Sequence, residues 1–176
     1  MPKEAVTQEN LLAILELLDS LKMRYWIDGG WGVDILCGKQ NREHRDVDID
    51  FDAAFTETLL DRLQQAGYEI TTDWRPCRIE LYHPQMGCYI DIHPLIIAED
   101  GSARQAAPDG GWYEFEADYF GRAPFGNRIV TCISAKAQKL FHTGYELREQ
   151  DEIDMRNLNA ATMEQVPGNA IEGNSL

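Results

Sequence analysis

Hydrophobic residues recur at helical spacing early in the chain and at a shorter spacing further on. Between residues 7 and 23, leucine and isoleucine return every three or four positions, which predicts an amphipathic helix that Thr7 or Asn10 can cap. Residues 25–27 are typical of a short strand. The strand ends at a Gly-Gly pair, and a short helix through residues 33–36 follows. This order predicts a helix, a strand and a second helix joined through a glycine turn.

Residues 44–52, HRDVDIDFD, show the most regular alternation. Val47, Ile49 and Phe51 alternate with three aspartates, Asp46, Asp48 and Asp50. Successive side chains on a strand point to opposite faces, so the pattern predicts a half-buried strand with three carboxylates on one side.

The remainder of the chain mixes further helices and strands. We predict strands at 78–82, 88–92, 112–118 and 128–134, a loop at 99–111, and helices that begin near Thr56 and Ser134 and within residues 152–161. This order predicts an α+β fold with a mixed or antiparallel sheet flanked by helices. We expect one compact domain over residues 1–160 and a flexible C-terminal tail over 161–176.

Composition narrows the kind of partner. A chain of 176 residues with 44% apolar residues is sufficient for one domain with a real core. The net charge of −14 argues against nucleic acid, because phosphate backbones require clustered Lys and Arg. The four cysteines are scattered along the chain. No apolar run approaches the roughly 18 residues of a membrane span. The N-terminus lacks the pattern of a secretory signal. These features predict a soluble, cytoplasmic protein without a membrane partner.

The aspartate strand is the best candidate for chemistry. Asp46 and Asp48 would lie within about 7 Å of each other, and such a pair repels unless a cation lies between them or one of them stays protonated. Asp91, on the polar face of the strand at 88–92, is a natural third carboxylate. Mg²⁺ accepts oxygen ligands of this kind and brings phosphate oxygens with it. An aspartate run is often only a solvated face, but the upstream Gly29-Gly30 turn, whose N–H groups can approach phosphate, favours chemistry.

These motifs also resemble a known family. WIDGGWGVD, followed by REHRDVDID, resembles the signature of the DNA polymerase β-like nucleotidyltransferase superfamily. With YIDIHP and CISAKAQKLFHTGY added, the chain is similar over residues 7–160 to the short lincosamide nucleotidyltransferases. The resemblance implies a nucleotidyltransferase-type sheet, one or two Mg²⁺ ions, ATP or another NTP as co-substrate, and a lincosamide antibiotic as acceptor.

The resemblance also implies roles for single residues. Asp46 and Asp48 would hold the metal, and Asp91 would hold metal and take the proton of the acceptor hydroxyl. Gly29 and Gly30 would face the triphosphate. A register slip would make Asp48 and Asp50 the metal pair instead.

Two positions depart from the family pattern. Trp31 stands where the superfamily has a serine, and His142 where the later helix often carries a lysine. The candidates for neutralising the triphosphate are therefore Arg42, His44, Arg45 and Lys139. We favour Arg42 and His44 because they directly precede the metal strand.

We therefore expect transfer of a nucleotide, most simply AMP from ATP, to a lincosamide hydroxyl, with release of pyrophosphate and resistance to lincomycin and clindamycin. The alternatives are an aminoglycoside nucleotidyltransferase or a non-catalytic nucleotide-binding or toxin–antitoxin relative. The presence of all three carboxylates favours catalysis. A zinc site made of His83, Asp91 and His93 is disfavoured because carboxylates outnumber histidines there. The small size and the family analogy predict a homodimer.

Overall fold

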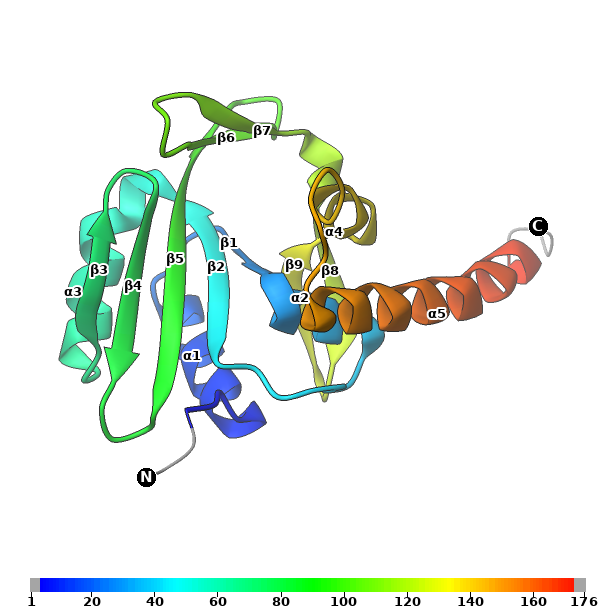
Figure 1. Ribbon diagram of the computed structural model, residues 1–176, viewed down its shortest axis with the longest axis horizontal. Coiled ribbons are helices and arrows are strands. Elements are labelled where there is room, and N and C mark those ends of the chain that lie inside the picture. The colour runs from blue at the N-terminus through cyan, green and yellow to red at the C-terminus, as the bar shows by residue number, and fades with distance from the viewer. Residues whose placement is uncertain (1–3, 173–176) are drawn as a thin grey trace.

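Nine strands form one mixed sheet in the computed structural model, which describes residues 4–172 and their side chains as far as residue 162 (Figure 1). The strands are β1 Tyr25–Asp28, β2 Asp46–Asp52, β3 Glu69–Trp74, β4 Arg78–His83, β5 Cys88–Ile97, β6 Ala103–Ala106, β7 Trp112–Phe115, β8 Phe120–Phe125 and β9 Arg128–Ile133. The helices are α1 Gln8–Ser20, α2 Gly29–Cys37, α3 Thr56–Gln65, α4 Ala135–Phe141 and α5 Glu149–Glu172. The α+β fold with a mixed sheet flanked by helices is confirmed.

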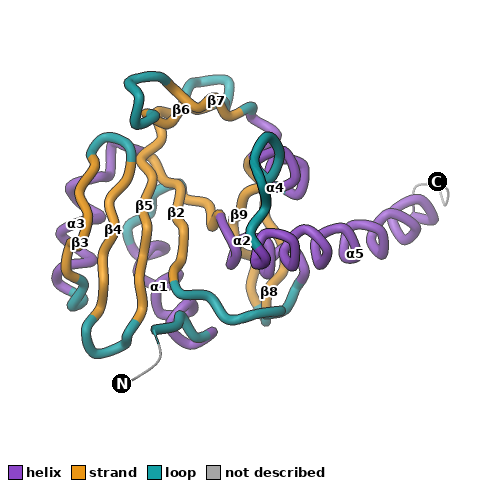
Figure 2. Tube along the Cα trace, in the orientation of Figure 1, coloured by secondary structure: helices purple, strands orange, loops and turns teal. Residues whose placement is uncertain are grey.

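The strand order places the aspartates in the middle of the sheet. It runs β3-β4-β5-β2-β1-β9-β8, with β6 added to β5 and β7 to β6 (Figure 2). Strand β2 runs parallel to β5 and antiparallel to β1. In this register Asp28 lies opposite Asp48, and Asp48 lies opposite Asp91. Three strands thus contribute one row of carboxylates.

One face of the sheet is buried by α1 and α3. The capping box of Thr7 and Asn10 begins α1, and the leucines of both helices pack in one core with Val47, Ile49 and Phe51. Because side chains alternate on a strand, this burial turns the aspartates of β2 to the opposite face.

The structure adds three strands to those predicted from the sequence. Strand β3 lies at the sheet edge and is mostly exposed, so its residues carry no alternating apolar pattern. Strand β6 lies within the segment predicted to be a loop, and β8 contains Pro124, which an edge strand tolerates. Because of this exposure and of the proline, these segments lack the alternating apolar pattern from which a strand is predicted.

Several helix boundaries also differ. Helix α2 begins at Gly29, because the Asp28 side chain accepts a hydrogen bond from the Gly29 N–H and caps it there. Thr56 does not cap α3; Phe55 holds that position, and the Thr56 hydroxyl donates to the Ala53 carbonyl. Helix α5 crosses residue 160 without a break, and the predicted division of the chain at that residue stays a prediction.

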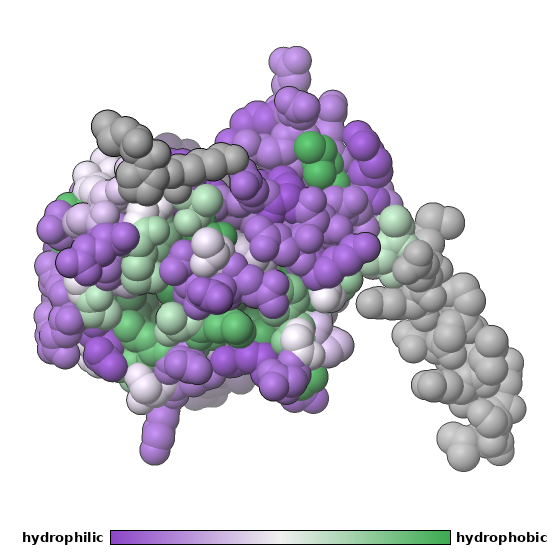
Figure 3. Space-filling view, turned by 90° about the horizontal axis from the view of Figure 1, so that it is seen from below, coloured by the Kyte–Doolittle hydropathy of each residue, from purple (hydrophilic) through white to green (hydrophobic). Residues whose placement is uncertain are grey.

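Hydrophilic residues cover much of the face drawn in Figure 3, in keeping with the acidic composition. Within the described residues, no helix combines the length and apolar character needed to cross a membrane. The four cysteines are free thiols.

Candidate active site

A cavity of about 820 Å³ opens where β2 meets the beginning of α2. Its lining includes six of the seven predicted site residues, which are Gly29, Gly30, Arg42, His44, Asp46 and Asp48. The seventh, Asp91, is buried on β5 directly beside Asp48. The fold therefore brings the predicted residues to one place.

The carboxylates of this cavity are crowded. Burial, together with the negative charges of Asp48 and Asp91, raises the pKa of Asp46 to about 6. Asp50 is 1% exposed and lies outside the cavity lining, and burial followed by the charge of Asp28 raises its pKa well above the ordinary value. This placement favours Asp46 and Asp48 over the slipped pair, whose assignment stays a prediction.

Asp48, Asp91 and His93 offer ligand atoms that lie within 4.8 Å of one another. The Nε2 atom of His93 is 3.3 Å from Asp48 Oδ1. Arg78 donates to both oxygens of Asp91 at 3.0–3.1 Å. His83, the other histidine of the zinc hypothesis, is buried elsewhere against the Ala66 carbonyl. The donor set is dominated by oxygen, which fits a hard divalent cation such as Mg²⁺.

The two glycines have a steric role. Gly29 has φ +59°, and a Cβ there would collide with the Asp48 carboxylate. A Cβ on Gly30 would collide with the Arg42 guanidinium and lie 2.6 Å from His44 Nδ1. The Gly-Gly pair thus allows a carboxylate and two basic side chains to pack against the first turn of α2.

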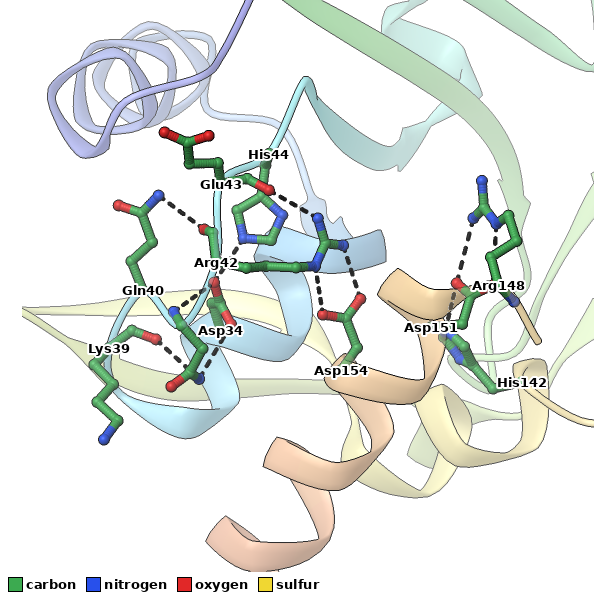
Figure 4. Close-up of polar contacts among 11 residues, drawn as sticks. Asp34, Lys39, Gln40, Arg42, Glu43, His44, His142, Arg148, Asp151 and Asp154 are labelled. Atoms are coloured by element: carbon green, nitrogen blue, oxygen red, sulfur yellow. Dashed lines mark hydrogen bonds and ion pairs between the residues drawn. The ribbon is translucent and has the colours of Figure 1, made fainter.

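Arg42 and His44 are held by acidic partners. Arg42 donates to both oxygens of Asp154 on α5 at 2.8 Å, and His44 Nε2 lies 2.6 Å from Asp34 on α2 (Figure 4). These contacts fix both side chains in the cavity wall. Their role in nucleotide binding stays a prediction.

Trp31 explains the departure from Gly-Gly-Ser. Its side chain is 1% exposed, and its ring packs 4.7 Å from the His44 ring and 6.2 Å from that of Phe125, between centroids. The residue after the glycines therefore supports His44 from within the core. Of the other candidates, Arg45 and His142 line the cavity, while Lys139 donates to Thr162.

Sequence reasoning missed several residues of this region. Asp28 precedes the glycines, and its Oδ1 accepts from the Gly29 N–H at 2.7 Å and from Gln138 Nε2 at 3.1 Å. Its place before the Gly-Gly pair was a usable capping signal. Arg148 also lines the cavity and pairs with Asp151 at 3.0 Å, but no local pattern marks either one.

A glycine-started helix that faces paired carboxylates, on this mixed sheet, defines a nucleotidyltransferase. The family model described as aminoglycoside-2''-adenylyltransferase matches residues 10–158, and the chain belongs to this family.

Two relatives agree with this assignment. A lincosamide resistance protein from Staphylococcus haemolyticus is 49% identical over 162 residues, which span 92% of this chain and all of that protein. The crystal structure of the lincosamide antibiotic adenylyltransferase LnuA, bound to lincomycin, is 48% identical with a TM-score of 0.83, covering 89% of this chain and 99% of LnuA. ANT(2'')-Ia in complex with adenylyl-2''-tobramycin has a TM-score of 0.65 at 19% identity over 90% of each chain, which shows a shared fold.

Proposed function

We propose that this protein transfers AMP from ATP to a hydroxyl of a lincosamide antibiotic, releases pyrophosphate, and so gives resistance to lincomycin and clindamycin. The observation that carries the proposal is the row of Asp48 and Asp91 beside the Gly29-Gly30 start of α2. The lincosamide acceptor is supported by the 49% identity to a lincosamide resistance protein.

The residues present fit a divalent cation. We propose that Asp46, Asp48 and Asp91 hold one or two Mg²⁺ ions, because burial and then the charges of Asp48 and Asp91 raise the pKa of Asp46, and a cation bound between the carboxylates would relieve both effects. Bound there, Mg²⁺ would neutralise phosphate charge and act as a Lewis acid.

The protein's own groups account for the remaining tasks. The first turn of α2 at Gly29 and Gly30 would face the phosphates, because the helix dipole there favours anions and the glycines leave room, while the Gly29 N–H itself is donated to Asp28. Arg42 and His44 border the same space. Asp91 takes the proton of the acceptor hydroxyl as that oxygen bonds to the α-phosphorus and pyrophosphate leaves. Burial raises the pKa of Asp91 against the opposing effects of His93 and Arg78, which makes it a better base than an exposed aspartate.

Mass spectrometry of reaction mixtures tests this function. Purified protein, Mg²⁺ and ATP are incubated with lincomycin, clindamycin or an aminoglycoside panel, and pyrophosphate is measured in parallel. We expect adenylated lincosamides, no product after chelation, and recovery when Mg²⁺ is restored. Asp91→Asn should abolish turnover while Mg·ATP still binds. Product with aminoglycosides alone would reassign the acceptor, and absence of any product would contradict the enzyme activity.

We also propose that the active form is a homodimer. The family analogy and the short chain support this, as does the exposed side chain of Tyr145 at the first cavity. Sedimentation of the enzyme at assay concentration checks it. A fully active monomer would contradict it.

A further inference from the structure

A second cavity of about 490 Å³ adjoins the first. The two share Asp28 and Phe141, and the second is otherwise lined by Gln105, Trp112, Tyr113, Glu114, Phe115, Leu140 and Thr143. We propose that this second cavity binds the acceptor, an amphipathic amine that carries hydroxyl groups, and that Asp28 at the junction is its specificity residue. The inference rests on the proposed function.

Large apolar side chains that are partly exposed form much of the wall of the second cavity. Trp112 is 43% exposed, Tyr113 54% and Leu140 49%, although all three are large apolar or aromatic side chains. Strand β7 supplies the two aromatic residues, and α4 supplies Leu140. Gathered around one hollow, these side chains offer a face for an apolar ligand rather than scattered surface contacts.

The aromatic wall is held in place before any ligand arrives. The Arg104 guanidinium stacks on the Trp112 ring at 4.3 Å, and Phe115 packs on Phe141 with ring centroids 5.5 Å apart. A wall that is already ordered costs less entropy when a ligand binds. This favours a binding surface over a loosely exposed hairpin.

Two acidic residues line the second cavity. Asp28 stands at the junction, and its carboxylate is oriented by hydrogen bonds from Gly29 and Gln138. Glu114 is exposed in the lining contributed by β7. Carboxylates beside aromatic rings suit a cation with an apolar body, because charge and stacking then act on one molecule. A polyanion would be repelled by these carboxylates.

The wall between the cavities is a chain of hydrogen bonds. Gln105, from the second cavity, has its Nε2 3.2 Å from His93 Nδ1, and His93, from the first cavity, contacts Asp48. The junction at Asp28 opens beside this wall, so a hydroxyl of a molecule seated on Trp112 lies next to the carboxylate row. The arrangement delivers the acceptor to the nucleotide without placing its apolar body among the charges.

Two variants test the assignment. Trp112→Ala removes the aromatic wall, and Asp28→Asn removes the charge while keeping a side chain that can cap α2. Ile129→Ala, at a residue that is 58% exposed on β9, is the matched control. Thermal midpoints verify folding. We measure the KM for lincomycin and for ATP, and lincomycin binding by calorimetry.

We expect both variants to raise the lincomycin KM about tenfold and to weaken lincomycin binding similarly, with the ATP KM of Trp112→Ala within about twofold of wild type and Ile129→Ala unchanged. If the wild type is active and neither substitution changes the lincomycin KM, the inference is refuted and the proposed function is not affected. Lincomycin binding that depends on Trp112 without any adenylated product would support the cavity and refute the function. Neither product nor binding in the wild type would refute both.

Discussion

The two adjoining cavities differ in what builds them. The first is lined by charged groups on the central strands and on α2, and ion pairs such as Arg42–Asp154 hold it. The second is lined by aromatic side chains on the β6–β7 hairpin and on α4, at the periphery of the sheet. Apart from Asp28 and Phe141, which line both cavities, chemistry and acceptor choice thus depend on different residues. A substitution in one cavity is expected to leave the task of the other largely intact.

Removal of the central carboxylate gives the largest expected effect. Asp48→Asn should lower kcat/KM by at least about 10³-fold, because the carboxylate common to both strand pairings is lost. Initial-rate kinetics with Mg·ATP measure it. Asp52→Asn is the control, since Asp52 lies on the same face of β2 but pairs with Arg24. Equal losses for the two variants would contradict a local role for Asp48.

A methyl group added to the first turn of α2 is expected to have the second largest effect, and to weaken ATP binding more than lincomycin binding. Gly30→Ala should raise the ATP KM by about 10- to 100-fold and destabilise the protein by about 1–3 kcal/mol, because the Cβ displaces Arg42 and His44. The lincomycin KM should change far less. Gly121→Ala, whose Cβ would meet its nearest neighbour at 3.7 Å, serves as control. Equal effects on both KM values would show that the cavities are not independent.

The Arg42–Asp154 ion pair in the wall of the first cavity is expected to make a smaller contribution, which concerns the stability of the folded state. Asp154 is 2% exposed, so Asp154→Ala leaves Arg42 without its partner and should cost about 1–3 kcal/mol in the free energy of unfolding. Urea denaturation measures this loss. Asp73→Asn breaks a solvent-exposed pair with Arg75 and should leave the midpoint unchanged. A matching loss at Asp73 would indicate a general charge effect.

The smallest expected effect is the loss of stability as the pH falls. Burial alone would raise the pKa of Asp151, but hydrogen bonds from Arg148 outweigh it and hold the pKa below its ordinary value. The pair therefore stabilises the folded state above about pH 4 and loses this contribution as pH falls through the lowered pKa. Arg148→Gln should be less stable than wild type at pH 7, and the difference should shrink toward pH 3. A difference that stays constant with pH would exclude Asp151 as its source.

Local periodicity predicted much of the central sheet. The alternation in residues 46–51 identified β2 and its aspartate face, and the two glycines marked the turn into α2. Edge strands were lost because exposure removes the apolar period, as in β3. Trp31 was noticed as a departure, but its packing on His44 depends on tertiary structure.

Contacts between distant segments were the main part of the site that could not be predicted. Arg78 reaches Asp91 across a strand pair, and Arg42 meets Asp154 across 112 positions of sequence. No local pattern encodes either partner, because both depend on which segments the fold brings together. The role of Asp28 at the junction likewise follows from the neighbouring cavities rather than from its own sequence context.

The row of carboxylates has a consequence for the order in which the protein folds and becomes active. Asp28, Asp48 and Asp91 come from three chain segments, and they align after both the antiparallel β1–β2 pair and the parallel β2–β5 pair have formed. Long-range pairings of this kind are the slow steps of folding. Recovery of activity during refolding should therefore lag behind the formation of α1 and report the moment at which the middle of the sheet closes. The return of enzyme activity would thus report the joint pairing of β1, β2 and β5.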